Sequence, residues 1–372
     1  MVYEDTSMKL IRPVMDQMEL DAVAEVLKSG LLTQGPKARC FEDLIKSYTD
    51  TKYAHATSSA TTGLHLALHA LGVGPGDEVI IPDFSFPATA NVIIQLGAIP
   101  IFIDIEISTF NIDASRIESA ITDRTRAIMP VHAFGLCADM HSIIEIAKKY
   151  GIPVVEDAAC ALGSKITDMH AGSFGDVGVF SFHPRKVITT GEGGMVVTNN
   201  FELNKRMHTL RSHGSIRGSH YLEFVDAGFN YRLSDINSAI GIIQMGRLNQ
   251  ILTKRYEIAM WYDELFSHLE FLRTPMSPDN FTHSYQSYVL LLDSELDRNK
   301  MIDDLRALNI ETTLGTYSIH LQPYFKDRFK LVDGDYPNST RAHRSALTIP
   351  VFNTMTFSDA ELVANSIIST LN

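Results

Sequence analysis

One lysine stands out for the chemistry that its surroundings favour. Lys186 lies in residues 180–194, which read FSFHPRKVITTGEGG, between a strand predicted to end at Ser181 and another predicted to begin near Met195. Lysine forms Schiff bases with carbonyl compounds, and its pKa shifts readily when it is desolvated. Aromatic residues, a proline and three glycines crowd this lysine. A solvated turn therefore explains the segment poorly, and we predict a reactive amine at a strand end.

Two carboxylates close a second apolar strand. Residues 154–157 read VVED, and strand alternation sends Glu156 and Asp157 to opposite faces, so one of them points into a site. A carboxylate at that position can bind a metal ion, a ribose or a protonated ring nitrogen. The alternative is an N-cap for the segment that follows.

Two further segments precede predicted helices. Residues 57–63 read TSSATTG, and free N–H groups and hydroxyls at a helix N-terminus can bind a phosphate, although an ordinary helix cap is the alternative. There is no Walker A or GxGxxG pattern. Residues 228–235 read GFNYRLSD and precede a long helix, so Ser234 or Asp235 is expected as its N-cap. Capping and function can share such a loop.

The elements that position these segments alternate between strands and helices. Strands are predicted at residues 78–81, 99–105, 127–131, 152–155, 177–181 and 195–198. Helical patterns lie between them, as at residues 61–71 and 139–150. This alternation predicts a mostly parallel sheet flanked by helices, the α/β class. Ligands of such sheets bind at the carboxyl ends of strands, so functional residues are expected just past each strand.

From about residue 235 the pattern changes to a smaller α+β domain. It predicts a helix at 235–270, a strand at 287–292, a helix at 297–308 and a last helix at 358–371 with Ser358 as N-cap. We therefore predict a large domain at residues 1–245 and a small C-terminal domain at residues 246–372, with the boundary inside the long helix.

Composition excludes several classes of protein. The chain has 372 residues, of which 45% are hydrophobic and 20% charged, so it is not disordered. A net charge of −12 without a dense Lys/Arg run argues against nucleic acid and anionic lipid as partners. No apolar run reaches the length of about 18 residues that a membrane span needs, and the N-terminus predicts no signal peptide. Three widely spaced cysteines fit neither a disulfide framework nor a metal site, which predicts a cytoplasmic protein without metal.

Taken together and in order, the motifs resemble the DegT/DnrJ/StrS family of sugar aminotransferases. They are SGxxTxGP at residues 29–36, GPGDEV at 74–79, SATT at 59–62, EDAA at 156–159, SFHPxK at 181–186, residues 188–194 and residues 228–234. Members are pyridoxal-phosphate (PLP) enzymes with the aspartate aminotransferase fold, PLP-dependent transferase fold type I. The resemblance covers essentially the whole chain.

The resemblance implies two catalytic residues. Lys186 matches the lysine that holds PLP as a Schiff base and then acts as general base. Asp157 matches the acid that pairs with the pyridine nitrogen and keeps the ring an electron sink. The other cofactor positions implied are Ala60 and Thr61 at the phosphate, Phe86 stacked on the ring, Ser181 as a hydroxyl donor, Cys160 near the phenolic oxygen and Asn230 from a neighbouring subunit. A homodimer with shared active sites follows.

Cys160 departs from the family pattern. Many members have Gln, Glu or His at this position, three residues after Asp157, and these side chains reach the phenolic oxygen of PLP. A thiol is a weak hydrogen-bond partner. The cofactor would then be tuned by water or by another group, and a plain packing role for Cys160 is the alternative.

The resemblance also implies the substrates. The acceptor is the keto sugar of a nucleoside-diphosphate sugar, the donor is glutamate, and the amino sugar serves polysaccharide or lipopolysaccharide biosynthesis. Residues 188–194 look more like members that aminate carbon 4 of a 4-keto-6-deoxy sugar than like those acting at carbon 3. Arg232, Tyr317 and His320 fall where substrate contacts are expected. For His320, a buried histidine with satisfied nitrogens is the alternative.

Two other functions remain open at this point. Some relatives are PLP-dependent sugar dehydratases that carry histidine in place of the lysine, so Lys186 favours transamination. A non-catalytic PLP-binding regulator normally needs a DNA-binding appendage, and the sequence shows no spare basic helix-turn-helix. Discharge of the bound cofactor by glutamate would separate an aminotransferase from both.

Overall fold

A seven-stranded sheet forms the centre of the computed structural model, which describes residues 7–370. Its spatial order is β1 (Tyr53–Thr57), β10 (Gly194–Thr198), β9 (Val177–Ser181), β6 (Val155–Asp157), β5 (Thr125–Ile128), β2 (Glu78–Pro82) and β4 (Ile99–Ile103). Single-residue parallel bridges, Ile128 with Val154 and Val131 with Asp157, join its two halves. β10 runs antiparallel to both neighbours, whereas the remaining pairs are parallel. The predicted mostly parallel sheet is confirmed.

The bounds of several predicted strands differ from the observed ones, most of all at β6. The sequence suggested residues 152–155, but β6 spans Val155–Asp157. Pro153 has no N–H to give to a ladder, so regular pairing begins only beyond it. The shift matters because it makes Asp157 the last residue of the strand, at the carboxyl edge of the sheet.

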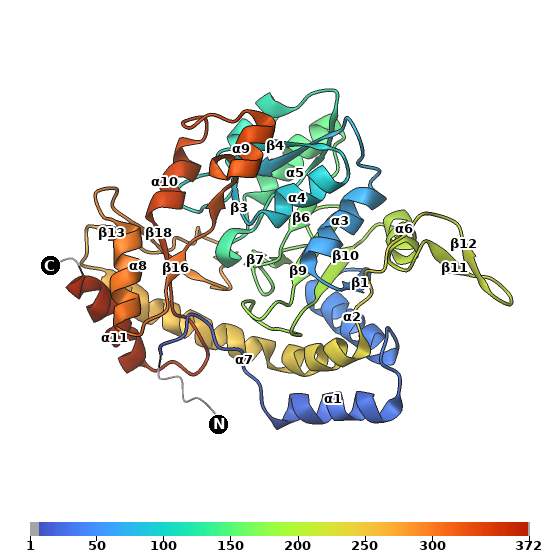
Figure 1. Cartoon of the computed structure of the whole chain (residues 1–372), viewed down its shortest axis with the longest axis horizontal. Helices are drawn as coiled ribbons and strands as arrows, with labels where there is room; N and C mark the ends of the chain where they lie inside the picture. Colours follow the sequence, from blue (N-terminus) through green and yellow to red (C-terminus); the bar gives the residue numbers. More distant parts are fainter. Residues whose placement is uncertain (1–6, 371–372) are drawn as a thin grey trace.

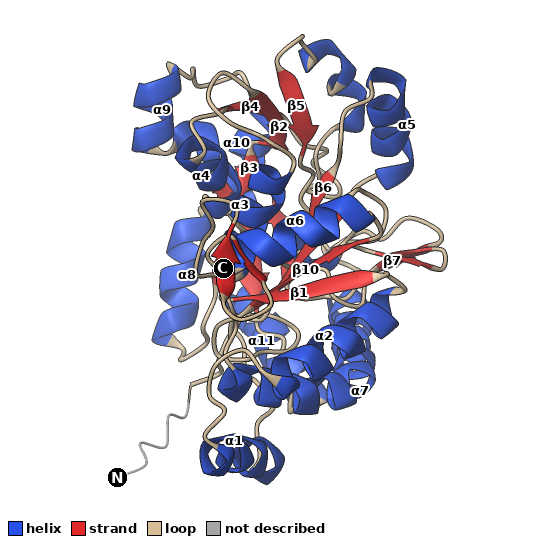
Figure 2. Cartoon of the chain, turned by 90° about the vertical axis from the view of Figure 1, so that its right-hand side faces the viewer, coloured by secondary structure: helices blue, strands red, loops and turns tan. Residues whose placement is uncertain are grey.

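Helices cover both faces of this sheet (Figure 2). α3 (Ala60–Ala70), α4 (Ala88–Gln95) and α6 (Phe201–Arg211) pack on one face, and α2 (Pro36–Thr49), α5 (Met140–Tyr150) and α7 (Asp235–Phe266) pack on the other. Successive residues of β2 point to opposite faces of the sheet. Val79 and Ile81 pack into the core on the first face, and Ile80 packs into the core on the second. This is the layering that the alternating strands and helices predicted.

The long helix α7 connects the two parts of the fold (Figure 1). Its 32 residues contact α1 (Gln17–Ser29) and α2 as well as α11 (Phe357–Ser369). Beside its C-terminal half lies an antiparallel sheet with its own core, flanked by α8 (Arg298–Ala307). Its order is β13 (Leu272–Arg273), β15 (Tyr288–Leu292), β18 (Ala346–Ile349) and β16 (Thr313–Leu314). The division into domains at residues 245 and 246 falls inside α7 and stays our proposal.

Helix caps both confirm and correct the sequence analysis. Ser234 caps α7 by accepting from the N–H of Asn237. Asp235 serves a different helix, because its carboxylate accepts N–H groups from the start of α2, including that of Ala38 at 2.9 Å. At the last helix the prediction of Ser358 was wrong: the N-cap is Thr356, which forms a capping box with Asp359.

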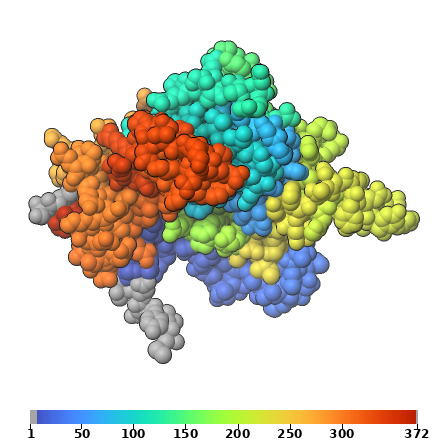
Figure 3. All heavy atoms as spheres, turned by 45° about the horizontal axis from the view of Figure 1, so that its top comes forward, coloured from blue at the N-terminus to red at the C-terminus, as the bar shows by residue number. Residues whose placement is uncertain are grey.

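Several short pairs and helices complete the description of the fold. They are β3 (Phe84–Ser85) with β17 (Tyr317–Ser318), β14 (Phe281–Thr282) with β7 (Lys165–Ile166) and β8 (Met169–His170), β11 (Ser215–Arg217) with β12 (Leu222–Phe224), α9 (Pro323–Phe329) and α10 (Pro337–Ser345). The β11–β12 hairpin projects from the body of the molecule (Figures 1 and 3). In the described part of the chain, no helix has the length and apolar character of a membrane span.

Candidate active site

β10 lies close to the N-terminus of α3, and this contact brings two of the predicted site segments together. Gly194 begins β10 and pairs with Ser181 at the end of β9 and with Thr57 at the end of β1. A Cβ on Gly194 would lie 2.5 Å from the carbonyl group of Ser59, the residue that precedes α3. Only glycine therefore lets β10 run so close to the start of α3. The result is that the Ser181 hydroxyl and the N-terminus of α3 share one edge of the sheet.

The N-terminus of α3 offers donors to an anion. Ser59 accepts from the N–H of Thr62, and the Thr62 hydroxyl accepts from the N–H of Ser59, each at 3.1 Å. The first-turn N–H groups of Ala60 and Thr61 have no partner inside a helix, and the helix dipole makes this end positive. The helix cap expected from the sequence is therefore confirmed, and it leaves N–H groups of the first turn to which a phosphate could bind.

Asp157 is a buried carboxylate held by neutral donors. Asp157 is only 5% exposed to solvent. Thr89 Oγ1 donates to Oδ2 at 2.9 Å, and the N–H of Ala159 donates to Oδ1 at 3.2 Å. Burial raises the pKa of Asp157, while the hydrogen bond from Thr89 opposes that rise. A cation placed at this carboxylate would relieve the cost of burying its charge.

Glu156 points to the opposite side of β6, as strand alternation predicted. Its carboxylate accepts from the N–H groups of Gly172 and Gly175 at 2.7 Å each and bonds to His132 Nε2 at 2.9 Å. The N–H of Ala138 donates to His132 Nδ1 at 3.1 Å, so the ring proton lies on Nε2, toward the carboxylate. Glu156 therefore supports the loop behind the site and leaves Asp157 to face it.

Lys186 reaches the same edge from the loop after β9. Its Nζ donates to Cys160 Sγ at 3.0 Å. A turn sets its position, since the Lys186 N–H donates to the carbonyl of His183 at 2.8 Å. Gln286 Nε2 holds the neighbouring Arg185 carbonyl at 2.8 Å. The amine is half-buried, and its positive charge acts on Asp157, the last residue of β6, where it lowers the pKa of the carboxyl against the larger rise caused by burial.

These groups fit PLP, which carries an aldehyde, a ring nitrogen and a phosphate. Lys186 supplies an amine, the start of α3 and Ser181 supply phosphate donors, and Asp157 supplies a buried negative charge. The two donors to Asp157 are uncharged, so a protonated ring nitrogen would provide the missing positive charge. The donor set therefore matches the three functional groups of the cofactor.

Phe86 lies directly after β3, the strand that pairs with the strand of Tyr317. Phe86 follows β3 and is 65% exposed, so its ring is open to a ligand. Tyr317 belongs to β17, where it pairs with Ser85 of β3. The strand pair thus brings a predicted substrate residue next to the residue predicted to stack on PLP.

The remaining predicted residues have different surroundings. Arg232 forms a backbone bridge with Thr57 and donates from Nη1 to Ser212 Oγ at 3.0 Å, so it lies beside the phosphate edge. Asn230 is exposed. His320 is fully buried.

Both ring nitrogens of His320 are occupied within the protein. Nδ1 lies 2.6 Å from Asp83 Oδ2, and Nε2 lies 3.2 Å from Thr340 Oγ1. This is the alternative noted from the sequence, a buried and satisfied histidine. Neither nitrogen is open to a sugar or a diphosphate in this arrangement.

Sequence reasoning missed the hydroxyls that support Asp157. Ser85 and Thr89 flank Phe86, and their oxygens lie 2.8 Å apart. A usable signal was present, since two hydroxyl residues four positions apart follow the predicted strand at residues 78–81. Their link to Asp157, 68 residues away, could not be read from spacing.

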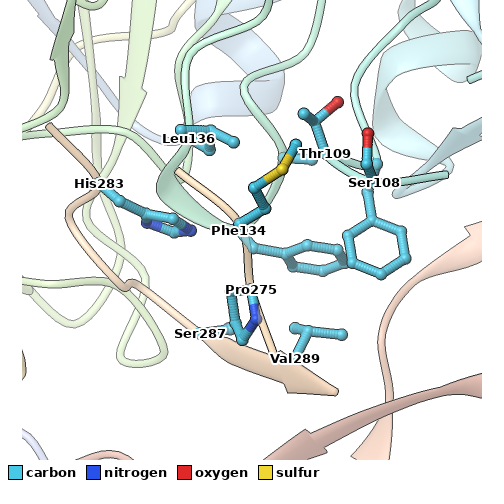
Figure 4. Close-up of a pocket in the computed structure, with 11 residues that line it drawn as sticks. Ser108, Thr109, Phe134, Leu136, Pro275, His283, Ser287 and Val289 are labelled. Carbon is cyan, nitrogen blue, oxygen red and sulfur yellow. The ribbon is translucent and has the colours of Figure 1, made fainter. Parts of the chain in front are cut away.

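A small cavity near the site is a separate feature (Figure 4). It lies between the 3-10 turn Ala133–Gly135, residues 108–110 and the start of β15, with Phe134, His283 and Val289 in its wall. Its volume is about 10 Å³, enough for one water molecule at most. It is therefore no substrate site.

Comparisons with known proteins agree with the geometry. A sequence model of the DegT/DnrJ/EryC1/StrS aminotransferase family matches residues 13–368. The spore coat polysaccharide biosynthesis protein SpsC of Bacillus subtilis is 36% identical over 368 residues, 95% of each chain. The aminotransferase TlmJ from Streptoalloteichus hindustanus has a TM-score of 0.93 and 32% identity, covering 98% of this chain and 100% of its own. The PLP form of the putative sugar aminotransferase Spr1654 from Streptococcus pneumoniae has a TM-score of 0.93 and 27% identity over 98% of both chains.

Proposed function

The chain belongs to the DegT/DnrJ/EryC1/StrS aminotransferase family, and on that premise we propose that it moves an amino group from glutamate to the keto sugar of a nucleoside-diphosphate sugar. It is a PLP-dependent sugar aminotransferase of fold type I. The observation that carries the proposal is the position of the Lys186 amine, at one sheet edge with the buried Asp157 carboxylate and the N-terminus of α3.

Each group of the site has a part in holding the cofactor. When bound, PLP supplies an aldehyde carbon that combines with amines and a ring that withdraws electrons from that carbon. Lys186 Nζ would anchor the aldehyde carbon, and the Asp157 carboxylate would hold a proton on the ring nitrogen. The N–H groups of Ala60 and Thr61, with the Ser181 hydroxyl, would bind the phosphate.

Lys186 has a second task as a base. Once its amine is free, Nζ would take the proton from the carbon of glutamate that carries the amino group, and this group would be held on a carbon of the bound cofactor between the two halves of the reaction. In the second half, Nζ would deliver a proton to the sugar carbon that receives the amino group. The transfer thus leaves 2-oxoglutarate and an amino sugar.

Substrate contacts follow from the edge around these residues. We assign Arg232, beside Thr57, to the carboxylate of glutamate or the diphosphate of the sugar nucleotide. Tyr317 is our candidate for a sugar contact, because its strand pairs with the one that precedes Phe86. The likeness of residues 188–194 to family members that aminate carbon 4 supports a 4-keto-6-deoxy sugar. The similarity to SpsC, a spore coat polysaccharide biosynthesis protein, supports a product used in polysaccharide biosynthesis.

We also propose a homodimer in which Asn230 completes the phosphate site of the partner. The β11–β12 hairpin that leads to Asn230 exposes large apolar side chains, among them Tyr221 at 73% and Phe224 at 69%. Exposed apolar groups gathered on one projecting element are typical of an interface. We keep the predicted cytoplasmic location as part of the proposal, since the three cysteines are free.

A substrate panel tests the proposed reaction. The PLP-loaded protein is incubated with glutamate and a set of 4-keto and 3-keto nucleotide sugars, and mass spectrometry detects the amino sugar. We expect the product from 4-keto-6-deoxy sugars and none from the Lys186→Ala variant. Amination of 3-keto sugars alone would overturn the assignment to carbon 4, and failure of glutamate to discharge the cofactor would overturn the donor.

A further inference from the structure

The Asp157 carboxylate has to be both ionised and correctly oriented, if it holds a proton on the ring nitrogen as proposed above. Burial works against the first requirement, since it raises the pKa of this carboxyl. Rotation about the Cβ–Cγ bond works against the second requirement, because it changes the direction of the carboxylate oxygens. The structure should therefore contain donors that fix this group, and one of them, Thr89, lies three residues after Phe86.

A chain of two hydroxyls ends on Asp157. Thr89 Oγ1 donates its only hydrogen to Asp157 Oδ2 at 2.9 Å. Ser85 Oγ lies 2.8 Å from Thr89 Oγ1, so the hydrogen of this second bond must come from Ser85. Ser85 is 3% exposed and Thr89 is 1% exposed. Hydrogen bonds arranged head to tail in a low dielectric strengthen one another.

Helix capping does not explain the Thr89 hydroxyl. Thr89 is the second residue of α4, whereas a capping threonine occupies the position before the first helical residue. Here the N-cap is Pro87, and α4 has no side-chain cap. The hydroxyl is used instead on a carboxylate of a different element.

Residues 85–89 place side chains on two sides of the segment. Ser85 and Thr89 point inward to Asp157, whereas Phe86 between them is exposed. The N–H of Thr89 donates to the Phe86 carbonyl at 3.2 Å, which keeps the turn closed. Ser85 also pairs with Tyr317 of β17. The segment thus joins Asp157, the predicted stacking residue and the C-terminal part of the fold.

We propose that Ser85 and Thr89 are positioning residues that act through Asp157, with Thr89 orienting its carboxylate toward the ring nitrogen and Ser85 orienting Thr89. This inference rests on the proposed role of Asp157. It predicts that removing the Thr89 hydroxyl weakens PLP binding only while residue 157 is charged.

The test measures PLP affinity of the cofactor-free protein by fluorescence titration, with the glutamate half-reaction as a second readout. Thr89→Val keeps the shape and removes the hydroxyl, so we expect PLP to bind about tenfold more weakly, the effect of one hydrogen bond to a charge. Thr89→Ser should restore affinity to within about twofold. Ser85→Ala removes only the outer bond and should cost about threefold.

A double variant separates positioning from mere structure. In an Asp157→Asn background, Thr89→Val should cause little further loss of affinity, because the charge on which it acts is gone. Thr49→Val is the matched control, since Thr49 is a buried threonine of α2 that donates to the Ile45 carbonyl, and it should bind PLP like the parent. If Thr89→Val does not fold, Ser85→Ala in both backgrounds decides the same question.

Three outcomes would overturn the inference. One is parental PLP affinity in Thr89→Val while Asp157→Asn is impaired, which leaves the role of Asp157 intact. Another is an equal loss on Thr89→Val in both backgrounds, which marks a structural role. Parental affinity and turnover in Asp157→Asn would instead overturn the proposed role of Asp157, and this inference with it.

Discussion

Lys186 Nζ lies 3.0 Å from Cys160 Sγ, so the amine that is to anchor the cofactor has a thiol as its nearest side-chain partner. The family resemblance led us to expect a stronger hydrogen-bond partner at this position. The thiol is half-buried, Cys137 is buried, and Cys40 is exposed on α2. The three thiols therefore differ in access, and only one of them lies in the candidate site.

The differing exposure of the three thiols predicts which of them an alkylating reagent modifies. In the cofactor-free protein, iodoacetamide should modify Cys40 and Cys160, whereas PLP should protect Cys160 by covering it. Modified Cys160 should lower PLP retention by at least about tenfold, because the added group occupies space beside Lys186. Peptide mass spectrometry measures the sites. Cys160→Ala should lose the sensitivity, and equal labelling of Cys160 with and without PLP would contradict the placement of the cofactor.

A second prediction concerns the stability of the cofactor-free protein. The pKa of Asp157 is raised by burial above its ordinary value of 3.8. A carboxyl whose folded-state pKa is raised costs stability above that pKa, and the cost disappears as the pH falls below the unfolded value. Asp157→Asn removes the charge, so at pH 7 the variant without PLP should melt roughly 1–3 °C higher than the parent.

The pH dependence checks the sign of this effect. The difference in Tm should close as the pH approaches 3.8, where the unfolded carboxyl takes up its proton. At saturating PLP the parent should melt at a higher temperature than Asp157→Asn, because the cofactor stabilises the parent more strongly than the variant. A parent that melts higher than Asp157→Asn at pH 7 without PLP would show that the buried charge is already compensated.

The buried pair of Asp83 and His320 gives a third prediction. Asp83 Oδ2 bonds to Nδ1 of His320 at 2.6 Å, and Asp83 Oδ1 accepts its backbone N–H at 2.8 Å. The pair ties residues 317–321 to the end of β2. Asp83→Ala leaves these donors buried without an acceptor, so it should lower the free energy of unfolding by roughly 1–3 kcal/mol for each donor.

A double-mutant cycle by urea denaturation tests that role for His320. His320→Ala and Asp83→Ala together should cost less than the sum of the single variants, by roughly 1–3 kcal/mol. If His320 instead serves the substrate, His320→Gln would lower turnover while leaving the urea midpoint unchanged. The two results separate a structural histidine from the substrate-binding one that the family resemblance implied.

Local features were predictable from the sequence, and long-range contacts were not. Lys186 and Asp157 could be singled out because each follows an apolar strand, and strand ends meet at one edge of a parallel sheet. The cap at Ser234 also follows from neighbouring residues. His320 was different, since its partner Asp83 lies 237 positions away. Nothing within a few residues of either side chain indicates that they meet.

The last prediction tests whether active sites are shared between subunits. Lys186→Ala should abolish transamination, because it removes both the anchor and the base, while Asp157 and the phosphate donors retain some PLP. Asn230→Ala should lose PLP more readily but keep its chemistry. If Asn230 serves the partner subunit, each site takes Lys186 from one chain and Asn230 from the other.

Mixed dimers of the two variants decide the question. In such a dimer, one site combines Lys186 of the Asn230→Ala chain with Asn230 of the Lys186→Ala chain and is therefore native, while its twin carries both changes. Dimers purified through two different tags should show about half of the parental activity at limiting PLP, above that of either variant alone. Mixed dimers of the parent with Lys186→Ala give the control, since they also hold one working site. Activity no higher than that of the Asn230→Ala homodimer would mean that Asn230 acts within its own chain, and the argument for an obligate dimer from a shared site would fail.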